Sequence, residues 1–135
     1  MAPDTVDRLV RPRQERLVDA IHEAGGLVRL HICGDITHIL ESIKSLRVDI
    51  LDCDWMVDMA HVRKVLGNSV TLTGNLDPVN AVMHSTPQSI REDLQRIYET
   101  VGNPWFVNAG CEIPAGTPIE NVKAMCEPIP VRNYP

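Results

Sequence analysis

GLVRLHICG, residues 26–34, is an apolar run that ends in a histidine and a cysteine. Its length and its flanking glycines predict a buried strand over residues 27–32. In an extended segment, side chains two positions apart point to the same side. His31 and Cys33 are therefore expected to face one point at the end of the strand. A nitrogen and a soft sulfur together are a ligand pair that zinc prefers.

A second apolar run, WFVNAG at residues 105–110, leads into Cys111 in the same way. One H-x-C pair is weak evidence, and a single cysteine is more often a small buried apolar residue than a ligand. Two strand ends that both carry soft ligands favour a metal site made of His31, Cys33 and Cys111. Three protein ligands with an open fourth position are typical of catalytic zinc sites.

The composition is that of an ordinary globular domain. The chain has 135 residues, of which 44% are hydrophobic and 23% charged, enough for one domain with a core. The net charge of −5, without a Lys/Arg cluster, argues against nucleic acid as a partner. No apolar stretch is long enough to span a bilayer, so we expect no membrane association and a cytoplasmic location.

The four cysteines are expected to be free thiols or metal ligands and not a disulfide framework. Cys53 and Cys126 do not fit the metal set, and both are predicted to be packing residues.

Strands and helices alternate along the chain. The predicted strands are residues 27–32, 48–51, 70–73 and 105–108. The predicted helices are residues 13–24, 37–46, 57–66, 78–83, 89–101 (capped by Thr86, with Pro87 at its first position) and 118–125 (capped by Thr117). A Pro-rich tail from about residue 127 is expected to be irregular.

This alternation predicts an α/β fold with a parallel sheet and crossover helices. Four strands form either a small open sheet or half of a (βα)8 barrel. The half barrel is favoured because polar residues follow each strand, and such barrels keep their chemistry at the rim formed by the carboxyl ends of the strands. The polar residues in question are His31, Cys33, Asp52, Asp54, Asn75, Asp77, Cys111 and Glu112.

Five segments in order carry a family resemblance: LHICGD at 30–35, DCDW at 52–55, LTGNLDP at 72–78, NAGCEIP at 108–114 and TPIENV at 117–122. With them the chain resembles the C-terminal half of the uroporphyrinogen decarboxylase superfamily. That superfamily includes cobalamin-dependent methyltransferases that act on coenzyme M and related thiols. The resemblance implies that residues 1–135 are a single partial domain, made of the last four βα units of a TIM-type barrel.

The two branches of the superfamily differ at the metal positions. The methyltransferases carry H-x-C and a later Cys that together bind zinc, and His31, Cys33 and Cys111 match this set. The decarboxylases end the last of these strands in Gly-His-Gly, where this chain has Gly110, Cys111 and Glu112. The resemblance therefore implies methyl transfer from a methylated corrinoid, free or on a corrinoid protein, to a small thiol such as coenzyme M. The alternatives are a decarboxylase-like fragment and a non-catalytic fragment that binds metal or dimerises.

Four further rim residues are expected to take part in the site. Asp54 and Glu112 are predicted as catalytic residues, and Asn75 and Asp77 as cofactor-binding residues. Glu112 would supply a fourth ligand or accept a hydrogen bond beside the metal, or would simply be solvated. Asn75 and Asp77 would contact the bound molecule or would only shape the turn and cap the next helix. For Asp77 the structural role is favoured.

Asp52 and Asp54 are two positions apart, so both are expected to face the barrel mouth. One of them would orient His31, because metal-binding imidazoles usually donate their other N–H to an oxygen. The alternative is that one of them caps the following helix.

The resemblance leaves out the family's N-terminal half. A half barrel has two open strand edges and an apolar inner face, and both favour pairing. We therefore expect a homo-oligomer, or pairing with a separate N-terminal half.

Overall fold

A four-stranded parallel sheet forms the centre of the structure, a computed structural model that describes residues 2–130. The strands are β1 (Arg29–Ile32), β2 (Ile50–Cys53), β3 (Thr71–Thr73) and β4 (Trp105–Phe106), in the spatial order β1-β2-β3-β4. The helices are α1 (Pro3–Thr5), α2 (Arg11–Glu23), α3 (Leu40–Ser45), α4 (Met59–Leu66), α5 (Pro87–Val101) and α6 (Ile119–Met125). Short helical segments are η1 (Val6–Val10), η2 (Thr37–Ile39) and η3 (Pro78–Met83).

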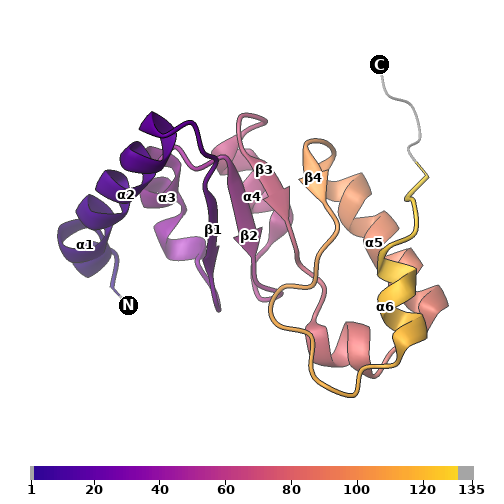
Figure 1. Cartoon of the computed structure of the whole chain (residues 1–135). Coiled ribbons are helices and arrows are strands. Elements are labelled where there is room, and N and C mark those ends of the chain that lie inside the picture. The colour runs from indigo at the N-terminus through magenta and orange to yellow at the C-terminus, as the bar shows by residue number, and fades with distance from the viewer. Residues whose placement is uncertain (1, 131–135) are drawn as a thin grey trace.

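Strands follow one another in chain order because each connection crosses over through helices to the next parallel strand. Helices α3 and α4 lie behind the strands, α5 and α6 lie beyond β4, and no described helix crosses in front of β1 and β2 (Figure 1). The α/β fold of four βα units is confirmed, and it has the arrangement expected for part of a barrel. Of the expected irregular tail, residues 127–130 form no helix or strand, and residues 131–135 lie outside the described part.

Strand β2 begins two residues later than the predicted segment 48–51. The reason lies in the turn before it. Arg47 has a φ of 59°, and the Asp49 carboxylate accepts a hydrogen bond of 2.7 Å from the Val28 amide. Val48 is buried, and its apolar character marked burial and not strand pairing. The register pairs Ile50 with Arg29 and so brings Asp52 opposite His31.

Helical structure starts at Pro3 and not at residue 13 as predicted. Pro12 lies in the first turn of α2, directly after η1, and the run from Pro3 to Glu23 is helical throughout. Val6 is buried against the core, which adds an apolar contact ahead of α2.

Capping residues were predicted correctly for one helix and wrongly for another. The Thr86 side chain accepts a hydrogen bond from the Ser89 amide at the start of α5, as predicted. The predicted Thr117 cap of α6 is wrong, because its hydroxyl donates back to the Pro114 carbonyl at 2.8 Å and Pro118 takes the capping position.

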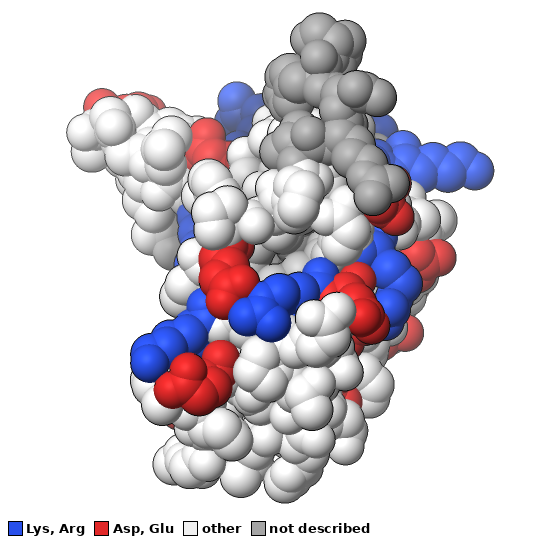
Figure 2. All heavy atoms as spheres, turned by 90° about the vertical axis from the view of Figure 1, so that its right-hand side faces the viewer, with Lys and Arg blue, Asp and Glu red and all other residues white. Residues whose placement is uncertain are grey.

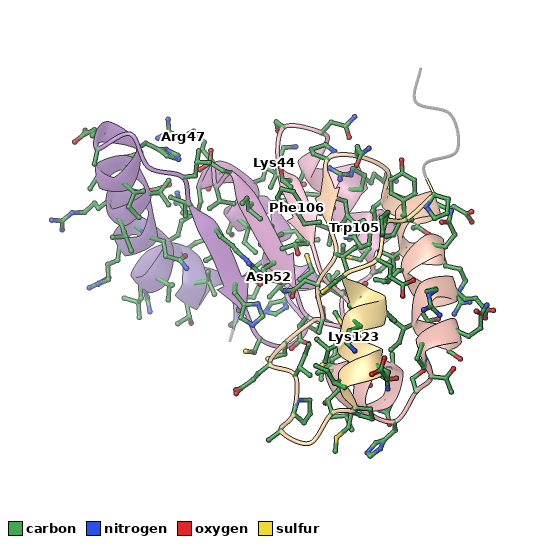
Figure 3. All side chains as sticks on the ribbon, turned by 45° about the vertical axis from the view of Figure 1, so that its right-hand side comes forward. Lys44, Arg47, Asp52, Trp105, Phe106 and Lys123 are labelled. Carbon is green, nitrogen blue, oxygen red and sulfur yellow. The ribbon has the colours of Figure 1, made fainter. Side chains whose placement is uncertain are left out.

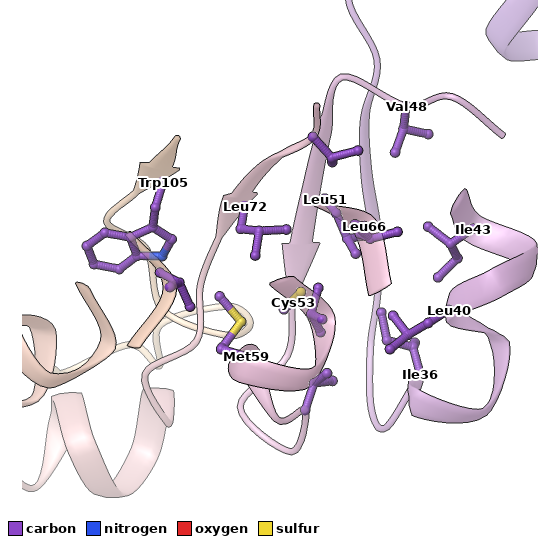
Figure 4. Packing of buried hydrophobic residues seen from close by; sticks show 14 of the residues in the cluster. Ile36, Leu40, Ile43, Val48, Leu51, Cys53, Met59, Leu66, Leu72 and Trp105 are labelled. Atoms are coloured by element: carbon purple, nitrogen blue, oxygen red, sulfur yellow. The ribbon is translucent and has the colours of Figure 1, made fainter. Parts of the chain in front are cut away.

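The hydrophobic core lies between the sheet and its helices. Leu51 and Leu72 point from the strands toward Leu40, Ile43 and Leu66 on the helices (Figure 4). All five side chains are nearly inaccessible to solvent. Burial of such apolar side chains is the main favourable contribution to the free energy of folding.

Cys53 belongs to this core, and its burial raises the pKa of the thiol to about 12. Its expected packing role is confirmed. The packing role expected for Cys126 is wrong, because this residue follows the last turn of α6 and is exposed.

The opposite face of the sheet carries polar side chains. His31, Asp52, Thr73 and Phe106 stand in register on neighbouring strands and form one row across this face. Asp52 lies near the middle of the sheet, and Phe106 on β4 is 59% exposed although its neighbour Trp105 is buried (Figure 3).

On the side formed by α5 and α6, basic and acidic side chains are interspersed (Figure 2). Ion pairs join Arg91 to Glu127 at 2.6 Å and Lys123 to Glu120 at 3.2 Å, so opposite charges on this surface offset each other. Within residues 2–130, none of the helices has the length and apolar character needed to cross a membrane.

Candidate metal centre

Three ligand atoms converge at the rim of the sheet. The distances are 3.2 Å from His31 Nε2 to Cys33 Sγ, 3.6 Å from Cys33 Sγ to Cys111 Sγ and 3.9 Å from Cys111 Sγ to His31 Nε2. We call His31, Cys33 and Cys111 the metal trio. Its two cysteines are 78 positions apart in the chain. In the described part of the chain, no other set of three or more His, Cys, Asp or Glu residues converges in this way.

The spacing of the metal trio fits a tetrahedral ion. Zinc–sulfur bonds of about 2.3 Å and zinc–nitrogen bonds of about 2.0–2.1 Å require sulfur atoms about 3.8 Å apart and nitrogen–sulfur distances of about 3.5 Å. The two nitrogen–sulfur distances of the metal trio, 3.2 and 3.9 Å, lie on either side of that value. The sulfur–sulfur distance of 3.6 Å is within a few tenths of an ångström of its ideal. Three donors leave the fourth position of such an ion open.

The ring of His31 is oriented by Asp52. His31 Nδ1 lies 3.2 Å from the backbone carbonyl oxygen of Asp52, and a carbonyl only accepts, so Nδ1 carries the hydrogen. The lone pair of Nε2 then faces the two sulfur atoms. This is the arrangement in which metal-binding imidazoles are usually held. The expected orienting role thus falls to Asp52, chiefly through its main chain.

The side chain of Asp52 is itself held by two neighbours. Arg29 donates to Asp52 Oδ2 at 2.6 Å, and Asn108 Nδ2 donates to Oδ1 at 3.2 Å. Neither Arg29 nor Asn108 was singled out from the sequence. The signal for Arg29 was its place two residues before His31, which puts it on the same face of β1.

Asp54 fixes the loop that carries Cys33. Its two carboxylate oxygens accept hydrogen bonds of 2.6 Å from the Gly34 amide and 2.7 Å from the Trp55 amide. The residue is only 5% exposed. The main-chain contacts give Asp54 a holding role beside Cys33, and the catalytic role expected for it stays a prediction.

Gly110 allows the loop after β4 to approach the loop that follows β2. A Cβ atom at this position would lie 2.3 Å from the Trp55 nitrogen and 2.9 Å from the Asp54 carbonyl carbon, far closer than a side chain tolerates. The Gly110 amide also donates to the Leu76 carbonyl at 2.7 Å. This close approach carries Cys111 over β3 and β2 toward β1. The sequence argument quoted Gly110 in a motif and missed this steric role.

The two thiols influence each other. The hydrogen bond with Cys111, together with the charge of that group, raises the pKa of Cys33 above its ordinary value. A bound cation acts in the opposite direction and favours the thiolate. The chemistry of the trio, two sulfurs and one imidazole, therefore suits a soft or borderline metal ion such as zinc.

The other rim residues are used differently. Asp77 accepts hydrogen bonds from the amides of Val79 and Asn80 at 2.8 and 3.0 Å and so caps η3, which confirms its structural role. Asn75 donates to the Val57 carbonyl at 2.8 Å. We call Asn75 and Asp77 the β3 turn group. Cofactor binding by this group stays a prediction, as does the role of the exposed Glu112.

Comparisons with known proteins agree with this architecture. The family model described as uroporphyrinogen decarboxylase (URO-D) matches residues 1–130. A uroporphyrinogen decarboxylase of Prochlorococcus marinus is 33% identical over 133 residues, which cover 94% of this chain and 36% of that protein. A methylcobamide:CoM methyltransferase of Methanosarcina acetivorans is 30% identical over 122 residues, covering 90% of this chain and 35% of the relative. The chain thus spans little more than a third of the length of these relatives.

Among solved structures, a methyltransferase from Methanosarcina mazei superposes with a TM-score of 0.83 at 24% sequence identity. The match covers 93% of this chain and 36% of the other. The fold described above is therefore part of a larger one in this structural relative.

Proposed function

The chain belongs to the uroporphyrinogen decarboxylase family, and from this we propose that it is the metal-binding part of a zinc-dependent methyltransferase. The proposed reaction moves a methyl group from a methylated corrinoid to a thiol such as coenzyme M. The observation that carries the proposal is the metal trio, whose ligand atoms converge at distances that suit zinc. The methylcobamide:CoM methyltransferase relatives support the same branch.

In this proposal each residue of the rim has a defined task. His31, Cys33 and Cys111 hold the ion. Zinc bound there would favour the thiolate form of a substrate thiol at neutral pH. The Asp52 carbonyl holds the imidazole in the tautomer that leaves Nε2 unprotonated. Asp54 keeps the Cys33 loop in place through the Gly34 amide.

The corrinoid partner would need an apolar surface beside the metal trio. The loop that follows β2 exposes two apolar side chains, Trp55 at 44% and Met56 at 52%. Trp55 directly follows Asp54, whose carboxylate accepts a hydrogen bond from the Gly34 amide. An exposed indole and a thioether suit contact with a large flat macrocycle.

A decarboxylase-like function is the second candidate, since uroporphyrinogen decarboxylases are also about a third identical to this chain. Such a function would not require the metal trio. It would require cations for an anionic tetrapyrrole, and Arg29 on the polar face of the sheet is already paired with Asp52. This pairing favours the methyltransferase proposal.

A complete site would also require the rest of a barrel. The edges of β1 and β4 have no further strand in the sheet of the described residues, and Phe106 stays exposed on the inner face. We propose that a second half barrel covers this face, supplied by another copy of the chain or by a separate N-terminal half. Cytoplasmic location also stays part of the proposal.

Native mass spectrometry of protein purified without added metal tests the assignment. We expect about one zinc per chain, and Cys111→Ser should weaken zinc binding by more than about 100-fold, because changes behind the ligands already cost 10–100-fold. Cys126→Ser, which removes an exposed thiol outside the metal trio, is the matched control and should bind zinc normally. The same spectra give the oligomeric mass.

A wild-type chain that is free of metal and takes up no added zinc would contradict the methyltransferase proposal. Zinc binding that survives Cys111→Ser would reject the ligand set while leaving other metal sites open.

A further inference from the structure

Cys33 and Cys111 are close enough to react with each other. We propose that they form a redox pair: a two-electron oxidant of the peroxide class joins them in a disulfide, and the oxidised form no longer holds a metal ion. Disulfide formation itself rests only on the geometry of the two thiols. The loss of metal rests on the proposed function.

The distance between the sulfur atoms is the first support. It is 3.6 Å, and a disulfide bond is about 2.05 Å long, so the two atoms need to approach by about 1.5 Å. Among the described residues, this is the one pair of thiols in contact. Cys33 is exposed, so a small oxidant reaches it directly, and Cys111 is half-buried beside it.

The local backbone gives the second support. Cys33 lies between β1 and Gly34, which has a φ of 86°, and Cys111 lies in the segment between β4 and α6. Both sulfurs are thus carried by loops and not by the interior of a strand or helix. Loops absorb an approach of this size more readily than a packed core does.

The reaction balances with hydrogen peroxide as the oxidant. One cysteine sulfur attacks a peroxide oxygen, the O–O bond breaks, and a sulfenic acid and one water form. The second sulfur attacks the sulfenic sulfur, the S–S bond forms, and the hydroxyl leaves as a second water. The two thiols lose two electrons and two protons, and the peroxide takes up both.

Oxidation removes both sulfur ligands at once. His31 alone remains of the metal trio, and one imidazole does not hold a zinc ion against water. Reduction by a dithiol restores both thiols and with them the ligand set.

The chain contains its own controls. Cys53 is fully buried and its pKa is raised to about 12, so it is shielded from the oxidant and stays a thiol. Cys126 is exposed like Cys33 but has no thiol neighbour in the described structure. A comparison of Cys126 with Cys33 therefore distinguishes the effect of exposure to the oxidant from the effect of a neighbouring thiol.

The test treats the metal-free chain with one equivalent of hydrogen peroxide, followed by intact mass measurement and non-reducing peptide mapping. We expect a mass loss of two hydrogen atoms and a peptide that links Cys33 to Cys111. Added zinc should bind to the reduced chain, fail to bind after oxidation, and bind again after dithiothreitol. Cys126→Ser should behave as wild type, and Cys33→Ser should form no disulfide within the chain.

Two outcomes would overturn the redox pair: Cys33 and Cys111 remain as open to alkylation as Cys126, or oxidation links chains through Cys126 and leaves Cys33 and Cys111 unjoined. A chain that carries the Cys33–Cys111 disulfide and still binds zinc as before would overturn the loss of metal. A reduced wild-type chain that binds no zinc contradicts the proposed function and not the redox pair. In that case peptide mapping of the Cys33–Cys111 disulfide still tests the redox pair.

Discussion

At the rim of the sheet, two groups of polar residues follow strands in the same way and do different things. The metal trio turns its three ligand atoms toward one another, within 3.9 Å. In the β3 turn group, Asp77 turns its carboxylate toward the amides of η3, and Asn75 turns its amide toward the Val57 carbonyl. A position at the rim therefore does not identify a binding residue. A rim side chain can bind a ligand when its polar atoms are not already hydrogen-bonded to backbone groups of the chain.

The strongest way to break this contrast is Gly110→Ala. The added Cβ would meet backbone atoms of Trp55 and Asp54, so the loop after β4 must move away from the loop that follows β2. We expect a loss of about 1–3 kcal/mol in the free energy of unfolding, as for other overpacked sites. Because Cys111 moves with the loop, zinc affinity should fall by more than about 100-fold. Urea unfolding and zinc titration measure the two effects.

Gly67→Ala is the control for this change. Gly67 has a φ of 68°, and a Cβ there would meet no atom within 4 Å. It should cost about 1 kcal/mol through backbone strain and leave zinc affinity unchanged. Equal zinc affinity in both variants would show that Gly110 does not place Cys111.

Asp54→Asn weakens the metal trio without touching a ligand. One of the two carboxylate oxygens becomes an amide that cannot accept from the Gly34 or Trp55 N–H, which leaves a buried donor unpaired. We expect a loss of about 1–3 kcal/mol in stability and a fall of about 10–100-fold in zinc affinity. The same measurements apply. Asp58→Asn makes the same chemical change at the cap of α4, where Asn serves nearly as well, and should leave both quantities almost unchanged.

Asp77→Ala tests the other side of the contrast. The cap of η3 is lost, which should lower the free energy of unfolding by about 1 kcal/mol. Zinc affinity should stay that of the wild type, because Asp77 belongs to the β3 turn group. A clear loss of zinc binding here, measured by titration of the folded variant, would erase the distinction between the two groups.

The smallest effect is expected at the amino end of the sheet. A hydrogen bond from the Val28 amide, and a second from His22, lower the pKa of Asp49 below its ordinary value. The ionised form is thus stabilised by folding. Its contribution is present above the unfolded pKa of about 3.9 and is lost as the pH falls through the lower folded value. The stability difference between wild type and Asp49→Asn, followed by urea unfolding from pH 6 downward, should shrink only at the acid end. A difference that is constant with pH would argue against this linkage.

The alternation of apolar runs and amphipathic segments predicted the fold. The cap of α5 at Thr86 and the bounds of η3 at residues 78–83 were also predicted from the sequence. The predictions were wrong where one local sequence pattern is compatible with two different structures. Thr117 has a capping side chain, but its hydroxyl finds the Pro114 carbonyl first. Val48 is apolar without being paired, since burial and strand pairing give the same signal.

For the site, the sequence argument named the ligands and Asp52 as a residue that could orient His31, but it missed the supporting roles of Arg29, Asn108 and Gly110. The contact of Gly110 with the β2 loop and the salt bridge of Arg29 to Asp52 join segments far apart in the chain. No periodicity within one segment encodes such a contact. Only the register of β1, β2 and β4 brings these groups together.

The separation of 78 positions between Cys33 and Cys111 has a consequence for how the chain folds. The strands pair in chain order, so β1 and β2 can join through short-range contacts long before β4 arrives. The metal trio forms only after the last strand has docked, and among the hydrogen-bonded contacts of residues 2–130 its contacts span the longest stretches of chain, so they carry the greatest loop-closure cost. An ion bound by the trio would therefore stabilise the complete sheet against global opening and leave the fraying of single helices unchanged. The rate at which the refolding chain binds metal would therefore report the rate at which β4 docks onto the sheet.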